Sequence, residues 1–347
     1  MNRNEFYIKR CLELAENGLG TTYPNPLVGC VIVHDEKIIG EGWHIKSGDA
    51  HAEVRAIASV KDESLLKKST IYVTLEPCSH FGKTPPCSDL IIAKKIPNIV
   101  VGTLDPFAKV AGIGIKKLLA AGRNVVVGVC EKECEALNKR FFTFHRKKRP
   151  YVILKWAETK HGFIAPLEQK SNEIFWITNS HAQQLVHKWR SKEQAILVGT
   201  QTALADNPKL NVRHWNGTNP TRVVIDKSLK LPGHLSLLDK SQPTVVFHDK
   251  GITEKNKDNL IYIGLDFNCE VLTQALEELY KLELQSIIIE GGSKTLQGFI
   301  DAGLWDEARV FTGQNDIDKG IKGPVLERQA TRTVDVEGDQ LNYFYND

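Results

Sequence analysis

The chain has 347 residues, of which 41% are hydrophobic and 25% charged, and its formal net charge is +3. This length exceeds the usual size of one domain, and the near-neutral balance gives no overall signature of nucleic-acid binding. The apolar runs are too short to span a membrane, the N-terminus lacks the apolar core of a secretory signal, and seven cysteines make a poor disulfide framework. We therefore expect a cytoplasmic protein of two domains with reduced thiols and no membrane or nucleic-acid partner.

The first part of the chain alternates predicted helices and strands. An amphipathic segment at 5–17 precedes a hairpin signal, LVGCVIVHDEKIIGEGWH, with HDE at 34–36 as its turn. Next come a helix in HAEVRAIASV, a strand in STIYVTLEP, a helix in CSDLIIAKKI, a strand in NIVVGTLDP, a helix in GIGIKKLLAAG and a strand in NVVVGVC. One further helix is expected over 131–145. Strands separated by helices of this length favour βαβ units and a sheet covered on both faces.

A basic run, HRKKRP, and the strand YVILKWAET after it place the domain boundary near 147–150. Such a run is more often a solvated helix end than a nucleic-acid patch. We accordingly set the domains to 1–147 and 148–347. The second repeats the α/β theme, with strands in AILVGT, TRVVID, PTVVFH, LIYIGL, SIIIEGG and EARVFTG and helices in SHAQQLVHKWRSK, VLTQALEELYKL and TLQGFIDAGL.

The first domain contains residues of the types and spacing that a zinc site needs. His51 and Glu53 open a predicted helix, Cys78 follows a buried-type strand, and Cys87 stands at the start of the next predicted helix. One histidine and two cysteines supply three ligands and leave the fourth tetrahedral position for water, whose pKa zinc lowers to about 7. Glu53 can then carry a proton from that water to a leaving nitrogen, as in zinc deaminases. Both cysteines lie near predicted helix starts, where the helix dipole favours thiolate.

A disulfide and a closed structural zinc site are the alternatives for these two cysteines. A closed site requires a fourth protein ligand, for which His80 is the candidate. The eight residues between the cysteines are rich in donors, which suits a substrate with a phosphate or several heteroatoms. The other cysteines lack ligand-like neighbours and are expected to be small core or surface residues: Cys11, Cys30, Cys130, Cys134 and Cys269.

Four segments, TYPNPLVGCVIV, GWH, HAE and EPCSHFGKTPPC, resemble the pyrimidine deaminase domain of the bifunctional riboflavin-biosynthesis deaminase/reductases. The resemblance implies a cytidine-deaminase-like α/β/α domain with one zinc ion on His51, Cys78 and Cys87 and with Glu53 as the proton shuttle. It also implies substrate contacts from Asn25, His44, Ser79, His80, Lys83, Thr84 and Asp105. The segment DPFAKVAGIGI is similar to the family pattern D-P-N-P-x-V-x-G-x-G, with Phe107 where asparagine is usual.

A glycine pair in the second domain, SIIIEGGSKTLQGFI, joins a predicted strand to a predicted helix. Backbone N–H groups at such a helix start can bind phosphate, although a plain turn that needs glycine explains the pattern equally well. GGSKT lacks the first glycine and the spacing of a P-loop, so a nucleoside-triphosphate site of that kind is excluded.

With LKWAETKHGFIA, WITNSHAQQLVHKWR and AILVGTQTALADNPKLNVR, this segment resembles the dihydrofolate-reductase-like reductase domain of the same family. The resemblance implies an NADPH site formed by Ala157, Trp176, Thr202, Asp206, Gly292, Ser293, Lys294, Thr295, Leu296, Gln297 and Gly298. It implies a substrate site formed by Lys155, Ile174, Arg190, Leu210, Arg213 and Glu290, in which the two arginines suit a phosphate. Lys155 is a candidate proton donor near the ribose, or alternatively a surface lysine of an edge strand. Ile174 stands where a serine is usual, and TKHG at 159–162, which includes His161, stands where the family usually has S-L-D-G.

The resemblance thus predicts two consecutive reactions of riboflavin biosynthesis on a small phosphorylated pyrimidine. The first is zinc-dependent hydrolytic deamination of 2,5-diamino-6-(5-phosphoribosylamino)pyrimidin-4-one. The second is NADPH-dependent reduction of the ribosyl group of 5-amino-6-(5-phosphoribosylamino)uracil, in a homo-oligomer that is a dimer or a tetramer. A nucleotide or nucleic-acid deaminase with an unrelated C-terminal domain and a non-catalytic zinc-stabilised binding protein are the rival interpretations.

Overall fold

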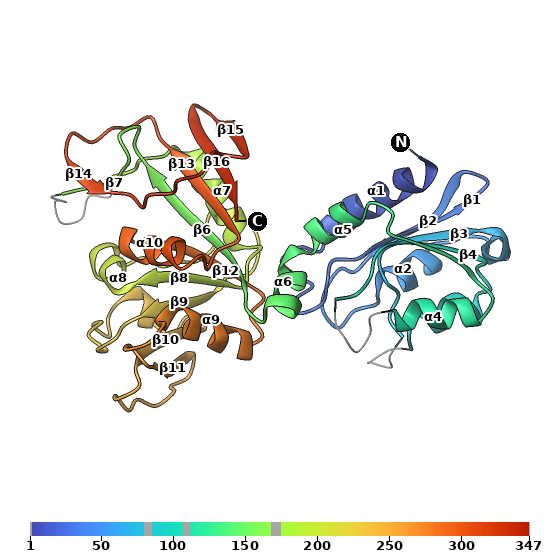
Figure 1. The fold of residues 1–347 in the computed structure, drawn as a ribbon, viewed down its shortest axis with the longest axis horizontal. Coiled ribbons are helices and arrows are strands. Elements are labelled where there is room, and N and C mark those ends of the chain that lie inside the picture. The colour runs from blue at the N-terminus through green and yellow to red at the C-terminus, as the bar shows by residue number, and fades with distance from the viewer. Residues whose placement is uncertain (1, 80–84, 107–111, 168–174, 347) are drawn as a thin grey trace. The chain divides into compact units, whose positions relative to one another are not determined.

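The computed structural model describes residues 2–79, 85–106, 112–167 and 175–346. The chain divides into two compact units, Met1–Lys148 and Arg149–Asp347 (Figure 1). Each unit has its own sheet and its own hydrophobic clusters. Among the described residues, no helix is long and apolar enough to cross a membrane.

The first unit is built on one mixed sheet with the strand order β2-β1-β3-β4-β5. Strand β1 pairs antiparallel with β2 and β3, whereas β3, β4 and β5 run parallel. The elements in chain order are α1 (Arg3–Glu16), β1 (Gly29–His34), β2 (Lys37–Trp43), α2 (Ala52–Ala58), η1 (Glu63–Lys68), β3 (Thr70–Leu75), α3 (Cys87–Ala93), β4 (Asn98–Thr103), α4 (Ile113–Ala120), β5 (Asn124–Val127), α5 (Glu131–Leu137) and α6 (Lys139–Lys147).

Helices cover both faces of this sheet, as the alternation of the strands predicts. On one face α1 packs Tyr7, Ile8 and Cys11 against Val31 and Val100 of the strands. On the other face α2, α3 and α4 pack against the residues of the opposite parity, among them Cys30, Ile32, Ile71 and Ile99. Figure 1 shows α1 on one side of the sheet and α2 and α4 on the other. Successive side chains of a strand point to opposite faces, so these buried strands supply both layers.

One expectation for this unit is wrong: the single helix over 131–145 is two helices, α5 and α6. The chain leaves helical geometry at Asn138, whose φ is −96° and ψ 20°. The buried Asn138 side chain accepts the N–H of Leu27 at 2.8 Å and donates to the C=O of Leu27 at 2.8 Å. These two hydrogen bonds to Leu27, which is far away in the sequence, interrupt the helix at Asn138. No local sequence pattern predicts this interruption.

The second unit has a nine-stranded sheet with the order β11-β10-β9-β8-β12-β6-β13-β16-β15. The strands from β11 to β13 are parallel, and β16 and β15 are antiparallel to their neighbours. The elements are β6 (Tyr151–Glu158), β7 (Phe163–Pro166), α7 (Ser180–Arg190), β8 (Ala195–Gly199), α8 (Thr200–Asp206), β9 (Thr221–Ile225), η2 (Ser236–Leu238), β10 (Thr244–Asp249), β11 (Leu260–Leu265), α9 (Val271–Lys281), β12 (Ser286–Gly291), α10 (Ser293–Asp301), β13 (Glu307–Thr312), β14 (Gly320–Lys322), β15 (Arg332–Val336) and β16 (Asp339–Tyr345).

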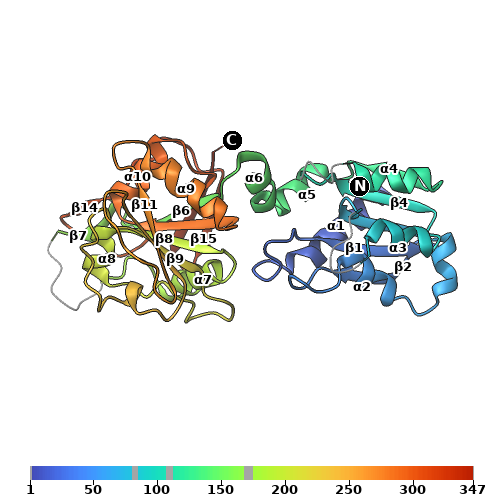
Figure 2. The same ribbon diagram turned by 90° about the horizontal axis from the view of Figure 1, so that it is seen from below.

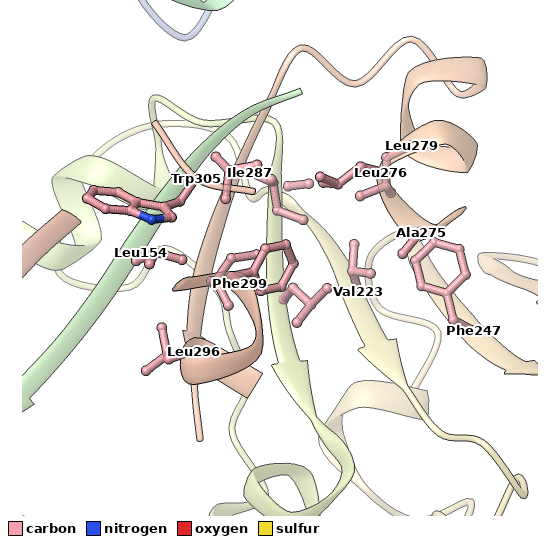
Figure 3. Packing of buried hydrophobic residues seen from close by; sticks show 14 of the residues in the cluster. Leu154, Val223, Phe247, Ala275, Leu276, Leu279, Ile287, Leu296, Phe299 and Trp305 are labelled. Atoms are coloured by element: carbon pink, nitrogen blue, oxygen red, sulfur yellow. The ribbon is translucent and has the colours of Figure 1, made fainter. Parts of the chain in front are cut away.

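Two hydrophobic clusters occupy the two faces of the parallel strands. On one face Leu276 of α9 and Phe299 of α10 pack on Leu154 and Ile287 (Figure 3). On the other face Val186 of α7 packs with residues such as Ile153. Figure 2 shows α9 and α10 on one side of β8 and β9 and α7 on the other. Because the strands from β11 to β13 are parallel, their carboxyl ends lie along one edge of the sheet. Open α/β sheets bind ligands at this edge.

Six elements of this unit were not predicted from the sequence: α8, η2, the small sheet of β7 and β14, and the hairpin of β15 and β16. The sequence carries a signal for the hairpin in Gly338, because its turn requires positive φ values. Glu337 and Gly338 have φ values of 51° and 92°. Strand β14 has only three residues, so its pairing with β7 is a tertiary effect.

Candidate functional site

The side chains of His51, Cys78 and Cys87 converge in the first unit. Their ligand atoms all lie within 4.8 Å of one another. The Nδ1 atom of His51 is 3.5 Å from the Sγ atom of Cys78 and 3.3 Å from that of Cys87. Donor atoms on one tetrahedral zinc ion, with bonds of about 2.0 to 2.3 Å, are separated by roughly 3.5 Å. The three residues therefore fit a zinc ion with one coordination position left for a non-protein ligand.

Local structure places each of these ligands. His51 is the extended residue directly before α2, Cys78 follows β3, and Cys87 is the first residue of α3. Cys78 itself is in the connection after β3, so the helix start near it is that of α3. The sulfur of Cys78 accepts the backbone N–H of Cys87 at 3.2 Å, at the start of α3. Hydrogen bonds from Cys87 and His51 lower the pKa of the Cys78 thiol, which favours the thiolate that zinc binds.

Glu53 lies beside this cluster, in the first turn of α2, and is only 3% exposed. Burial raises the pKa of its carboxyl to about 7, and the negative charge of Cys78 acts in the same direction. A carboxyl group in this range can both take up and release a proton near neutral pH. It is the residue type and position that a proton shuttle requires.

Asn25 and His44 form a hydrogen-bonded pair next to the ligand His51. The Nδ2 atom of Asn25 is 3.0 Å from Nε2 of His44, and Nδ1 of His44 is 3.3 Å from the C=O of Ala50. Burial lowers the pKa of His44, so the ring is neutral, with Nδ1–H donating to Ala50 and Nε2 accepting from Asn25. The rings of His44 and His51 meet edge-on with centroids 5.5 Å apart.

The remaining predicted deaminase residues fall into two groups. Ser79 is half-buried directly after Cys78, and Asp105 is half-buried after the end of β4. The expected contacts from His80, Lys83 and Thr84, and the departure at Phe107, lie outside the described residues.

Glu76 was quoted in the cysteine motif without a role, and the structure gives it one. Its buried carboxylate accepts the backbone N–H groups of Gly112 and Gly114 at 2.8 Å each, and of Asp105 and Ile115 at 3.4 Å each. A carboxylate at the start of α4 also complements the helix dipole. Gly114 is required here, since a Cβ atom would lie 2.2 Å from the C=O of Pro77. Glu76 therefore connects Asp105 and the start of α4 to the end of β3, the strand that precedes Cys78.

In the second unit, two turns at the carboxyl edge of the sheet meet closely. A Cβ atom on Gly199, between β8 and α8, would lie 2.5 Å from Oγ1 of Thr295. A Cβ atom on Gly292, the residue before α10, would lie 2.9 Å from Oγ1 of Thr202. The close approach requires glycine and leaves the first backbone N–H groups of α10 at this edge, a suitable place for a dinucleotide phosphate.

The predicted NADPH residues differ in burial and in their place in the fold. Ala157 is half-buried next to the last residue of β6, and Ser293, Lys294 and Thr295 form the first turn of α10. Leu296 instead points into the core (Figure 3). Gln297 accepts the N–H of Val325 at 2.7 Å, and Gly298 follows it in mid-helix. Trp176 is 46% exposed before α7, and Asp206 is the exposed last residue of α8.

Three charged residues form the buried centre of the predicted reductase site. Arg190, at the end of α7, donates to Glu290 through Nε at 3.0 Å and through Nη2 at 2.6 Å. Burial opposes ionisation of Glu290, but the charges of Arg190 and Lys155 lower its pKa to about 2. Burial lowers the pKa of Lys155, while Glu290 supports its charge. Because β6 lies between β12 and β13, the alternative of an edge-strand surface lysine is excluded.

The other predicted substrate residues lie along the segment after α8. Leu210 is buried with a positive φ of 48°, and Arg213 is exposed. Ile174 lies outside the described residues. The Nδ1 atom of the exposed His161, in the tetrapeptide TKHG, is 2.7 Å from Oδ2 of Asp316.

Comparison with known proteins places both units. Residues 1–103 match the cytidine and deoxycytidylate deaminase zinc-binding region, and residues 150–313 match the RibD C-terminal domain. The chain is 40% identical over 321 residues to the riboflavin biosynthesis protein RibD of Aquifex aeolicus, with 91% of this chain and 88% of that protein covered. It is 35% identical over 348 residues to RibD of Escherichia coli, with 94% and 93% covered.

The chain belongs to the RibD family.

A crystal structure from Thermotoga maritima, described as a diaminohydroxyphosphoribosylaminopyrimidine deaminase/5-amino-6-(5-phosphoribosylamino)uracil reductase, is also similar. It superposes with a TM-score of 0.88 at 35% identity, covering 99% of this chain and 98% of that chain. RibD of Acinetobacter baumannii superposes with a TM-score of 0.87 at 31% identity over the same shares.

Membership of the RibD family confirms the resemblance drawn from the motifs and both fold predictions. The first unit is cytidine-deaminase-like and the second is the RibD reductase fold. The chain is accordingly a bifunctional deaminase/reductase of riboflavin biosynthesis. The match over 150–313 excludes the rival interpretation of an unrelated C-terminal domain.

Proposed function

We propose that residues 1–147 carry the deaminase and residues 148–347 the reductase, each with its own active site. The deaminase would hydrolyse 2,5-diamino-6-(5-phosphoribosylamino)pyrimidin-4-one, and the reductase would reduce the ribosyl group of 5-amino-6-(5-phosphoribosylamino)uracil to ribityl. The observation that carries the proposal is the convergence of His51, Cys78 and Cys87 beside the buried Glu53, in a chain related to RibD over nearly its whole length.

In the deaminase site, His51, Cys78 and Cys87 would hold one zinc ion, which when bound supplies a Lewis acid that makes a water molecule acidic. Glu53 takes a proton from the attacking water and gives a proton to the leaving amino nitrogen. The ring carbon gains the oxygen, its bond to the exocyclic nitrogen breaks, and ammonia leaves. Asn25 and His44, fixed by their mutual hydrogen bond, are placed to orient the pyrimidine ring.

Five further residues complete the proposed deaminase substrate site in two groups. Ser79 and Asp105 flank the pair of elements that Glu76 ties together, which supports a role in holding the substrate. The loop residues His80, Lys83 and Thr84 would add donors for the phosphate or the ring, as the family resemblance implies.

In the reductase site, the backbone at the start of α10, with Thr202 and Ala157, would hold NADPH, which when bound supplies a hydride. The substrate C1′ accepts the hydride after its bond to the ring oxygen opens, and the released oxygen needs a proton. Lys155 is the proposed donor because it is half-buried and the charge of Glu290 favours its protonated form. Arg190 and Arg213 would bind the phosphate.

Several finer points are part of this proposal. We place the enzyme in the cytoplasm, since all seven cysteines are free thiols. A net charge of +3 over 347 residues supports a small-molecule substrate rather than a nucleic acid. A homo-oligomer, either a dimer or a tetramer, is proposed from the family resemblance.

The test is to incubate the diaminopyrimidinone substrate with and without NADPH. Ammonia should appear in both reactions, and cofactor oxidation only where NADPH is supplied. Zinc content and ammonia release should be measured together. A chain with zinc but no ammonia release, or NADPH oxidation that does not depend on deaminated substrate, would contradict the proposal. NADH in parallel tests the choice of cofactor.

A further inference from the structure

His187 has no role in the site as derived so far, yet it lies one helical turn before Arg190 on the same face of α7. Its side chain is 3% exposed. The Nδ1 atom accepts the backbone N–H of Arg213 at 3.2 Å. An imidazole nitrogen can accept a hydrogen bond only when it carries no proton, so the ring proton is on Nε2.

The groups around His187 keep the ring neutral. Burial lowers its pKa to about 4, and the positive charges of Arg190 and Arg213 act in the same direction. Glu290 is the opposing charge, on β12. The ring of His214 packs edge-on against that of His187, with centroids 4.8 Å apart. The acceptor for the Arg213 N–H is therefore present throughout the neutral pH range.

Neighbouring residues of α7 hold the rest of the segment 211–217. Arg190 donates to the C=O of Asn211 at 3.3 Å, and the ammonium of Lys188 lies 5.0 Å from the centre of the Trp215 ring. A Cβ atom on Gly217 would lie 2.5 Å from that of Ser191. The segment thus follows the surface of the helix, and the contact from His187 is at its middle.

The guanidinium groups of Arg190 and Arg213 lie near one another, because both donate to Asn211: Arg190 to its C=O at 3.3 Å and Arg213 to its Oδ1 at 3.4 Å. The charge of Arg190 adds to burial in lowering the pKa of Arg213, with Glu290 opposing. Arg213 itself is exposed. Two arginines whose charges repel in this way, one of them with donors available to solvent, are suited to an anion that bridges them.

We propose that His187 is a positioning residue of the reductase: by holding the backbone of Arg213 it sets that guanidinium beside Arg190 for the phosphate of the substrate. This inference rests on the proposed function, because it takes the phosphate of 5-amino-6-(5-phosphoribosylamino)uracil as the anion. In chemical terms, the neutral imidazole of His187 on α7 accepts a hydrogen bond that sets the position of the cationic Arg213 on another segment.

The test compares H187A and H187N with H181A, which changes an exposed histidine of the same helix. Losing one positioned charge-assisted contact should raise the KM for the phosphorylated uracil by roughly tenfold in H187A. The kcat, the KM for NADPH and the rate of ammonia release should stay within about twofold. H187N should recover most of the loss because the asparagine Oδ1 can accept the same N–H, and H181A should resemble the wild type.

A double-mutant cycle separates positioning from a general structural role. If His187 acts through Arg213, the KM of H187A/R213A should equal that of R213A alone. Additive effects, or an H187A variant with a lower kcat and an unchanged KM, would overturn the inference.

Binding of ribose 5-phosphate, followed by calorimetry without turnover, separates this inference from the proposed function. Wild-type protein should bind it, and H187A should bind it roughly tenfold more weakly. If the wild type binds ribose 5-phosphate but oxidises no NADPH with the uracil substrate, the proposed function fails and the positioning role stands. If H187A and wild type bind ribose 5-phosphate equally, the positioning role is refuted whatever the activity.

Discussion

Removing Arg190 should destabilise the second unit strongly, because Glu290 would then be a buried carboxylate without its partner. The side chains of Arg190 and Glu290 are 11% and 8% exposed, and two hydrogen bonds of 3.0 and 2.6 Å join them. R190M keeps much of the apolar stem and deletes the charge. The variant thus isolates the ion pair from the packing of α7.

Two estimates of the effect agree. The fall in the pKa of Glu290 from 4.5 to about 2 corresponds to about 3 kcal/mol of stability at neutral pH, at about 1.36 kcal/mol per pH unit. Breaking a buried pair by removing one partner typically costs about 3 to 5 kcal/mol. We therefore expect R190M to lower the free energy of unfolding of the second unit by about 3 kcal/mol. R190M/E290M should recover part of this loss, because it removes the buried carboxylate together with its hydrogen-bonding partner. The recovery should be incomplete, since Lys155 also loses the charge of Glu290.

Tryptophan emission during urea unfolding can follow this unit separately. Trp43 is in the first unit, and the other tryptophans are in the second: Trp156, Trp176, Trp189, Trp215 and Trp305. The emission midpoint should shift in R190M, while ammonia release keeps its wild-type urea dependence. A cost below about 1 kcal/mol, or a double variant less stable than R190M, would refute the reasoning about the pair.

Four other predictions test the two sites. E53Q should reduce ammonia release at least about 10²-fold while the zinc content and the NADPH oxidation with deaminated substrate persist; deamination that survives this change would mean that Glu53 is not the shuttle. Removing zinc with a chelator should abolish ammonia release and leave reduction of 5-amino-6-(5-phosphoribosylamino)uracil intact, and added zinc should restore the loss. E76Q should lower the free energy of unfolding of the first unit by about 2 kcal/mol, since an amide NH₂ would face backbone N–H donors. The control E16Q, at an exposed glutamate, should leave that free energy unchanged. Equal midpoints in urea for E76Q and wild type would contradict this prediction. Because the folded pKa of Glu290 is depressed, its contribution is present above pH 4.5 and lost as the pH falls from 4.5 towards 2, so the wild type should lose more stability than R190M over this window when urea midpoints are compared.

Some features of this protein could be predicted from the sequence because their signals are local. The alternation of predicted strands and helices indicated an α/β fold for both units, and the glycine pair at 291–292 marked the turn before α10. The ligands His51, Cys78 and Cys87 were also identifiable, since a strand end and two helix starts are each visible in a few residues. The same motifs indicated the RibD family, and the comparisons confirm it.

Tertiary structure decided the contacts between segments far apart in the sequence. The break at Asn138 comes from its bonds to Leu27, and the role of Glu76 comes from N–H groups more than twenty residues away. Whether Lys155 is a surface or an inner residue depended on the place of β6 in the strand order.

The neutral acceptor on His187 is the same kind of feature, because its partner Arg213 lies on another segment. A residue type and a period of 2.0 or 3.6 determine which face of an element is buried, and these are properties of neighbouring residues. Which polar group a buried side chain meets depends on how the elements pack. For that reason the residue types of the zinc site could be predicted from the sequence. The contacts of Glu76 near that site and of His187 near the proposed phosphate site could not.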